Sequence, residues 1–184
     1  MVLLLILIDG GICSAVRSCL NVVMKTVLVL TCVAVPNYCA DGSFSDPTAR
    51  LGPLQNTVRS VACEAGVPAD FALAIIEHES KFSNAMRGSH GEIGASQILP
   101  ATAKALGFDP ARLASEFSYN ARAGVTILKA LLRRSAGDQK AASCCYRAGP
   151  GWSKLPAKKQ STVLAYAQTI ERLKLHYSGL DCRP

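Results

Sequence analysis

Apolar residues recur at three- and four-residue intervals through most of the chain after residue 53, a pattern that predicts helices. Between these segments lie turn formers such as Gly66, Pro68 and Gly107. The helix-spaced positions are Leu54, Val58, Val61, Ala62 and Ala65; Ala72, Ile75 and Ile76; Ala121, Gly124, Val125, Leu128, Leu131 and Leu132; and Val163, Tyr166, Ala167, Ile170, Leu173 and Tyr177. Shorter helices are expected from Pro100 to Leu106 and over 141–146. No segment reads as a long strand, so we predict an all-α fold.

One helix combines an apolar face with a carboxylate. Ile76, Ile75 and Ala72 lie three, four and seven residues before Glu79, so all four share one stripe. Partial removal of water raises the pKa of a carboxyl group, which suits a general acid at neutral pH. Glu77 lies about 200° further round the helix, where a solvated surface acid is expected.

The segment after Glu79 is too rich in glycine, serine and asparagine to continue as a helix. We expect residues 83–94 to form a loop that presents polar groups to a groove. Pro100 suits the first turn of the next helix, and Gly107 suits its end.

The first forty residues differ from the rest. Their apolar runs, 2–8 and 27–35, are shorter than the roughly 18 residues of a membrane span. Residues 1–40 are interpreted as an export leader, with a possible true start at Met24. Cleavage after Ala40 and a retained anchor both stay open. Residues 41–52 are then a flexible lead-in and 53–184 a single domain, exported to the periplasm or cell envelope.

Charge restricts the partners. The formal net charge is +7; Arg17 and Lys25 against Asp9 give the leader +1, which leaves +6 for residues 41–184. A basic exported protein favours an anionic polymer, and without a recognition motif nucleic acid is not expected. Cell-wall glycan with acidic peptides fits this charge. The bland alternative is that the C-terminal basic residues simply solvate a helix face; they are Lys158, Lys159, Arg172 and Lys174.

Four of the eight cysteines fall in the leader, and Cys63, Cys144, Cys145 and Cys182 remain. Because no C-x-x-C motif is present and the nearby histidines, interpreted as surface residues, lack partner ligands, we expect neither a metal site nor a cofactor. Those histidines are His78 and His90. An oxidising compartment favours disulfides. Adjacent Cys144 and Cys145 should not bond each other, so one of them is predicted to pair with Cys63 or Cys182; buried free thiols are the alternative.

Four motifs in order resemble the goose-lysozyme-like lytic transglycosylase domain. The chain reads Glu79-Ser80-Lys81-Phe82, then Gly94-Ala95-Ser96-Gln97-Ile98-Leu99-Pro100-Ala101-Thr102-Ala103, with Gln97 eighteen residues after Glu79. Asn120-Ala121-Arg122-Ala123-Gly124 and Tyr146-Arg147-Ala148-Gly149-Pro150-Gly151 follow. The match extends over residues 54–177. The resemblance implies a lysozyme-like domain of about six to seven helices with a loop-lined glycan cleft.

It also implies a reaction. In this family a single glutamate protonates the glycosidic oxygen between N-acetylmuramic acid and N-acetylglucosamine of peptidoglycan, and the muramic acid 6-hydroxyl then closes a 1,6-anhydro ring. Glu79 is the catalytic candidate. The substrate-binding candidates are Ser80, Ser89, Ser96, Gln97, Tyr146 and Arg147, with Tyr146 expected to reach Glu79 or the glycan. A monomer that opens the wall for secretion, pilus or conjugation machinery is the role implied.

The chain departs from the family pattern at four positions. Arg147 stands where Asn is usual, Ser96 where Met is common, Ile127 where Tyr is common and Gly88 where Ser is frequent. Two alternative functions stay open, and Arg147 and Ile127 favour the second of them. A muramidase of the same fold would hydrolyse the glycan, with Glu92 as a second carboxylate. A non-catalytic peptidoglycan-binding or scaffold protein would bind the wall without cleaving it.

Overall fold

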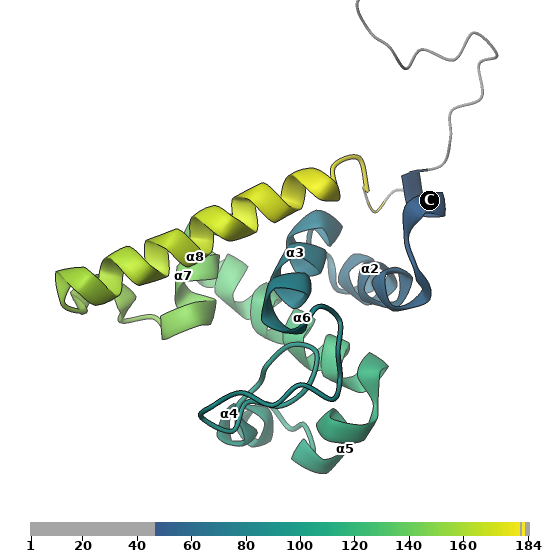
Figure 1. Cartoon of the computed structure of the whole chain (residues 1–184), viewed down its shortest axis with the longest axis horizontal. Coiled ribbons are helices and arrows are strands. Elements are labelled where there is room, and N and C mark those ends of the chain that lie inside the picture. The colour runs from purple at the N-terminus through teal and green to yellow at the C-terminus, as the bar shows by residue number, and fades with distance from the viewer. Residues whose placement is uncertain (1–46, 181, 183–184) are drawn as a thin grey trace, which may run out of the picture. The chain divides into compact units, whose positions relative to one another are not determined.

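The computed structural model describes residues 47–180 and 182, which are entirely helical apart from loops and isolated bridges (Figure 1). These residues form seven α-helices, so the all-α, lysozyme-like prediction is confirmed. The predicted leader over 1–40 and the start at Met24 lie outside the described residues. The elements are η1 (Pro47–Arg50), α2 (Pro53–Ala65), α3 (Ala69–Ser80), α4 (Pro100–Ala105), α5 (Pro110–Ser115), α6 (Phe117–Arg134), α7 (Gln139–Ala148), η2 (Trp152–Lys154) and α8 (Ala157–His176).

Helix α3 is the centre of the fold. Its residues from Phe71 to Ile76 are all fully buried, because α2 and α8 pack against different faces and α6 adds a third contact. A helix that is apolar on every side must be enclosed in this way. It ends abruptly because Lys81 and Phe82 both adopt left-handed backbone angles, with φ of 54° and 63°. Glu79 therefore lies in the last turn, where the buried helix meets the surface.

Helix α5 was not predicted. Asp109 caps it by accepting a hydrogen bond from the Ala111 amide at 2.9 Å, and Pro110 occupies its first position. The sequence contained this cap and proline signal. The Gly107–Pro110 segment instead reads as a simple break because the helix is six residues long and buries one side chain, Leu113.

Helix α8 packs along α3 and α7 (Figure 1) and corrects the interpretation of Glu77. Tyr177, just after α8, donates a hydrogen bond to Glu77 Oε2 at 2.8 Å. The Glu77 side chain is 22% exposed and lies 4.0 Å from Lys81 Nζ. It is therefore a partly enclosed link between α3 and the C-terminal segment instead of a solvated surface acid.

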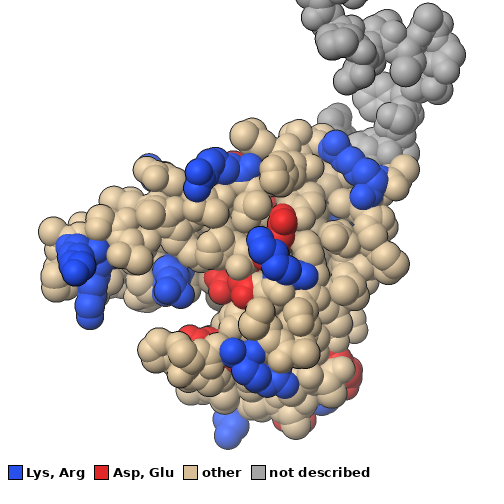
Figure 2. Space-filling view, viewed as in Figure 1, with Lys and Arg blue, Asp and Glu red and all other residues tan. Residues whose placement is uncertain are grey.

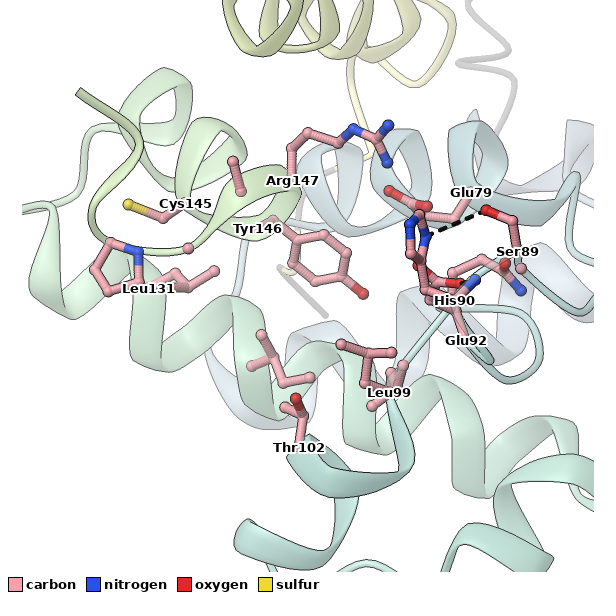
Figure 3. A pocket seen from close by; sticks show the side chains of 17 residues that line it. Glu79, Ser89, His90, Glu92, Leu99, Thr102, Leu131, Cys145, Tyr146 and Arg147 are labelled. Carbon is pink, nitrogen blue, oxygen red and sulfur yellow. Dashed lines mark hydrogen bonds and ion pairs between the residues drawn. The ribbon is translucent and has the colours of Figure 1, made fainter. Parts of the chain in front are cut away.

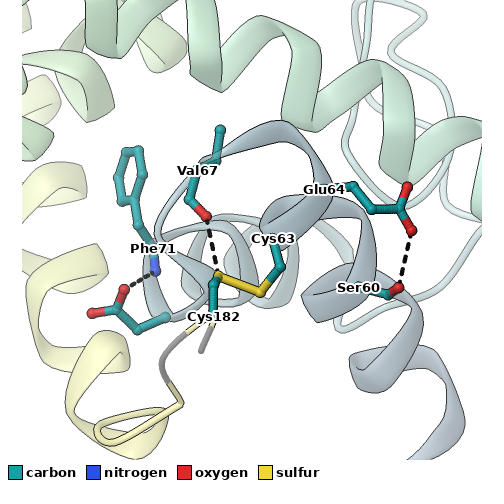
Figure 4. The surroundings of a disulfide bond; sticks show 7 residues. Ser60, Cys63, Glu64, Val67, Phe71 and Cys182 are labelled. Atoms are coloured by element: carbon teal, nitrogen blue, oxygen red, sulfur yellow. Dashed lines mark hydrogen bonds between the residues drawn. A yellow bond between two sulfur atoms is a disulfide. The ribbon is translucent and has the colours of Figure 1, made fainter. Parts of the chain in front are cut away.

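The disulfide joins Cys63 of α2 to Cys182, 119 residues later (Figure 4). The predicted pairing of Cys144 or Cys145 with one of these cysteines is therefore wrong. Both α7 thiols are free; Cys144 is buried and Cys145 half-buried. Helix α7 turns Cys144 toward Val163 and Ala167 of α8, away from α2. The bond ties the C-terminal segment to the end of α2.

The described part of the predicted lead-in, from residue 47 on, contacts the C-terminal segment. Residues 47–50 form η1, and Arg50 donates a hydrogen bond to the Ser178 carbonyl at 2.7 Å. Within 47–180 and 182, no helix has the length and apolar character needed to cross a membrane.

Reduction of the Cys63–Cys182 bond should cost much of the folding stability. A cross-link that closes a loop of this length restricts the unfolded chain, so Cys63→Ser should lower the free energy of unfolding by about 3–5 kcal/mol. Urea denaturation of the oxidised protein measures this. Cys145→Ser is the control, expected within about 0.5 kcal/mol of wild type. Equal stability of Cys63→Ser and wild type would show that the bond does not form.

Candidate functional site

A cleft of about 690 Å³ opens beside the end of α3. Its wall is built by Glu79, the loop over 88–99, the middle of α6 and the end of α7. Figure 2 shows the molecule deeply hollowed on this face, with acidic side chains toward the inner end of the hollow and basic ones along its margin. The predicted loop-lined cleft is therefore present, and its volume suits a chain of sugar rings.

Glu79 is half-buried at this cleft, as its helical stripe predicts. Tyr166 of α8 donates a hydrogen bond to Glu79 Oε1 at 2.6 Å. Burial raises the pKa of the Glu79 carboxyl, against lowering contributions from the Tyr166 hydrogen bond and the Arg147 charge, while Glu92 adds a further raising contribution. The group therefore holds its proton to higher pH than an ordinary glutamate.

Tyr166, and not Tyr146, makes the contact with Glu79 that was one of the two alternatives predicted for Tyr146. Tyr146 lines the cleft, but its hydroxyl donates to the Ser96 carbonyl at 2.6 Å and not to Glu79. Tyr166, expected only as an apolar helix position, supplies the hydrogen bond to Glu79. Sequence spacing could not distinguish them, because the choice depends on how α7 and α8 pack beside α3. Both hydroxyls have a raised pKa, first because they are buried.

Two asparagines hold the loop, and sequence reasoning did not assign them this role. Asn120 of α6 is fully buried; its Oδ1 accepts from the Ser96 amide at 2.8 Å, and its Nδ2 donates to the carbonyls of Ile93 and Leu113. Asn84 accepts from the Ala95 amide at 3.3 Å. A Cβ at Gly94 would collide with the side-chain amides of both asparagines, and the φ of 74° at this position also favours glycine. The available signal was a polar residue on the apolar face of α6.

Two predicted substrate-binding residues lie beneath the surface. Ser80 is 2% exposed and donates to the Ala95 carbonyl at 2.7 Å. Ser96 is fully buried and donates to the Asn120 carbonyl at 3.3 Å. Neither lines the cleft. Ser96 also fills the space above Gly124, where a Cβ would strike its hydroxyl. Both serines position the loop, and in this structure neither can contact a ligand in the cleft.

The other four predicted binding residues do line it: Ser89, Gln97, Tyr146 and Arg147. The side-chain amide of Gln97 donates a hydrogen bond to the Gly94 carbonyl at 2.8 Å. This bond helps to hold the Gln97 backbone at its left-handed φ of 46°. Ser89 is exposed and its hydroxyl lies 3.2 Å from His90 Nδ1. Arg147 extends from α7 toward the part of the cleft that holds Glu79 (Figure 3).

Glu92 is a second carboxylate in the same cleft (Figure 3). Hydrogen bonds from its own backbone amide and from that of His90 lower its pKa, and the His90 ring, 3.5 Å away, lowers it further. A Cβ at position 88 would collide with the Glu92 carboxylate. Glycine in place of the usual serine at 88 therefore makes room for Glu92.

His78 corrects another prediction. It is half-buried and not on the open surface, and its ring meets the Tyr166 ring edge-on at 4.7 Å. Burial, with the charges of Lys81 and Arg147, lowers its pKa, so the ring is neutral at pH 7. It packs against the ring of the tyrosine that donates to Glu79. Among residues 47–180 and 182, no three His, Cys, Asp or Glu side chains are grouped to hold a metal ion.

The hydrogen bond from Tyr166 should be measurable in the titration of Glu79. Since this bond stabilises the carboxylate, Tyr166→Phe should raise the Glu79 pKa above its already raised wild-type value. Carboxyl ¹³C shifts followed against pH report it. Tyr177→Phe is the matched control, because Tyr177 donates to Glu77 and should leave Glu79 unchanged. A lower Glu79 pKa in Tyr166→Phe would contradict this assignment.

Comparison with known proteins agrees with the motifs. The family model described as "Transglycosylase SLT domain" matches residues 56–168. The 70-kDa soluble lytic transglycosylase of Escherichia coli is 19% identical with a TM-score of 0.58, over 66% of this chain and 23% of that one. A complex of the 70-kDa soluble lytic transglycosylase with bulgecin A is 19% identical, with a TM-score of 0.58, over 68% of this chain and 24% of that one. An inactive mutant of lytic transglycosylase Slt from Pseudomonas aeruginosa is 22% identical, with a TM-score of 0.53, over 74% of this chain and 25% of that one.

These structures establish the shared fold, and this chain spans about a quarter of their length. The family model covers more than half of the chain and includes Glu79, Gln97 and Tyr166. The chain therefore belongs to the family of transglycosylase SLT domains.

Proposed function

We propose that this protein is a peptidoglycan lytic transglycosylase that uses Glu79 as its acid. The observation that carries the proposal is a half-buried carboxyl with a raised pKa, at the wall of a sugar-sized cleft and oriented by Tyr166. A carboxyl in this environment is protonated where an exposed glutamate is not, which a general acid requires. Membership of the SLT domain family supports the same reaction.

The residues suggest how the steps would proceed. Protonated Glu79 gives its proton to the oxygen between muramic acid and N-acetylglucosamine, and the C1–oxygen bond breaks. The resulting carboxylate takes the proton of the muramic acid 6-hydroxyl as that oxygen bonds to C1. A 1,6-anhydro sugar and a free N-acetylglucosamine end result, and Glu79 is protonated again. Tyr166 stabilises the carboxylate between these steps by its hydrogen bond to Oε1.

Export to the cell envelope is part of the proposal. A disulfide between Cys63 and Cys182 suits an oxidising compartment, which supports secretion. Action as a monomer that opens the wall for a secretion, pilus or conjugation assembly stays a prediction from the family resemblance. Deletion of the gene with no effect on any such assembly would contradict that role.

A digest of purified sacculi tests the chemistry. Wild-type protein should release muropeptides with 1,6-anhydro ends, identified by mass spectrometry as one water lighter than hydrolysed products. Glu79→Gln should lower the rate of release by roughly 10²–10⁴-fold, because the glutamine cannot supply a proton. Glu77→Gln is the matched control on the same helix and should keep most of the activity, since Glu77 does not line the cleft.

Sacculi that are bound but never solubilised by wild type would instead indicate the non-catalytic binding protein. Release at equal rates by wild type and Glu79→Gln would exclude Glu79 as the acid.

A muramidase is the second candidate, and Glu92 is the observation that favours it. Two carboxyls line one cleft, and their pKa values are shifted in opposite directions, Glu79 upward by burial and Glu92 downward by hydrogen bonds. Such a pair can divide the acid and base roles of a hydrolase. In that reaction ionised Glu92 would activate a water molecule for attack on C1.

Glu92→Gln decides between the two reactions. A transglycosylase should keep its anhydro products in this variant, with a change in rate of less than about tenfold, since Glu92 then acts only through its charge. A hydrolase should give reducing-end products in the wild type and lose them by roughly 10²-fold or more in Glu92→Gln. The masses of the products, measured in the digest described above, report the outcome.

A further inference from the structure

Arg147 is a cation at the cleft without a partner of its own. Its side chain is exposed, it lines the cleft, and among residues 47–180 and 182 it donates no hydrogen bond and forms no ion pair. Its contact is an approach of the guanidinium to the Tyr166 ring, 6.0 Å from the centroid. Five N–H donors are therefore available to a ligand.

The two acids of the cleft do not occupy Arg147. Glu79 is desolvated and receives the Tyr166 hydroxyl at 2.6 Å. Glu92 accepts from the His90 amide at 2.9 Å and lies 3.5 Å from the His90 ring. The basic group is thus directed into the site (Figure 3) while the acids are engaged elsewhere.

A simpler explanation is that a cation at the end of a helix interacts well with the helix dipole. Arg147 does lie in the last turn of α7. The helix dipole therefore explains why a basic residue lies in the last turn of α7. It does not account for the direction of the side chain, which approaches the tyrosine that holds Glu79.

We propose that Arg147 is a specificity residue that binds a carboxylate carried by the glycan, so that the cleft favours acidic strands over neutral ones. The proposal rests on the function proposed above, because the strand selected is the one that Glu79 cleaves. Arginine suits this task because its planar guanidinium matches a carboxylate with two parallel hydrogen bonds. The carboxylate could belong to the lactyl group of muramic acid or to the attached peptide.

Binding of an acidic strand would also act on Glu79. The Arg147 charge favours the carboxylate form of Glu79, as does the Tyr166 hydrogen bond, while burial and the Glu92 charge favour the neutral form. A ligand carboxylate on Arg147 offsets its charge. The acid of the enzyme is then protonated more fully when the correct substrate is in place.

Four substrates separate the possibilities: glycan strands with and without peptides, each with carboxyls free or converted to methylamides. The ratio of kcat/KM for free over amidated strands measures the preference. Wild type should show a ratio of up to about five, and Arg147→Gln should lower this ratio to about one. Arg147→Lys should retain part of it, and the preference should weaken at high salt. The ratio cancels any effect of the variant on Glu79 that is common to both substrates.

Arg122→Gln is the matched control, since Arg122 is exposed on α6 and does not line the cleft. A preference confined to peptide-free strands assigns the lactyl carboxylate, and one confined to peptide-bearing strands assigns the peptide. Cleavage with the same ratio in wild type and Arg147→Gln overturns the inference and leaves the proposed function intact. If wild type cleaves no strand, the proposed function fails, and Kd values for the same four strands with wild type and Arg147→Gln still decide whether Arg147 selects carboxylates.

Discussion

The site depends on the burial of α3 up to its last turn. Phe71 to Ile76 are fully enclosed, and the chain then leaves the helix through two residues with positive φ, Lys81 and Phe82. Each such residue costs about 1–2 kcal/mol, a cost that the surrounding packing must offset. As a result, the Glu79 carboxyl lines the cleft at the end of a buried apolar helix. Its raised pKa follows from this placement, because burial is its largest cause.

Side-chain hydrogen bonds from α3, α6 and α7 hold the loop that lines the cleft beside Glu79. Asn120 satisfies the Ser96 amide and two carbonyls from inside the protein, and Ser80 and Tyr146 donate to carbonyls of the same loop. A loop without regular structure would otherwise leave these groups unpaired and costly. Residues that the family resemblance marks as binding groups therefore divide into two kinds. Ser80 and Ser96 shape the cleft from beneath, while Gln97 and Arg147 line it.

The sequence predicts what depends on local spacing. The stripe from Ala72 to Glu79 needs only the helical period, and the structure agrees with its burial and with the direction of the pKa shift. Contacts between distant helices are a different matter. The Tyr166 hydrogen bond spans 87 residues and the disulfide 119, so both depend on how α8 and the C-terminal segment pack. Short elements such as α5 fall between these cases, because few apolar positions define them.

Two departures from the family pattern, Gly88 and Arg147, both affect the charged groups of the cleft. Glycine at 88 leaves the space that the Glu92 carboxylate fills, because a Cβ at this position would meet that carboxylate. The acid at 92 adds negative charge beside Glu79, and the cation at 147 adds positive charge, with opposite effects on the Glu79 pKa. Both charges act on a carboxyl that is itself partly desolvated, where charge–charge interactions are stronger than in bulk water. Because the two charges act in opposite directions they offset each other in part at Glu79, and burial stays the largest cause of its raised pKa.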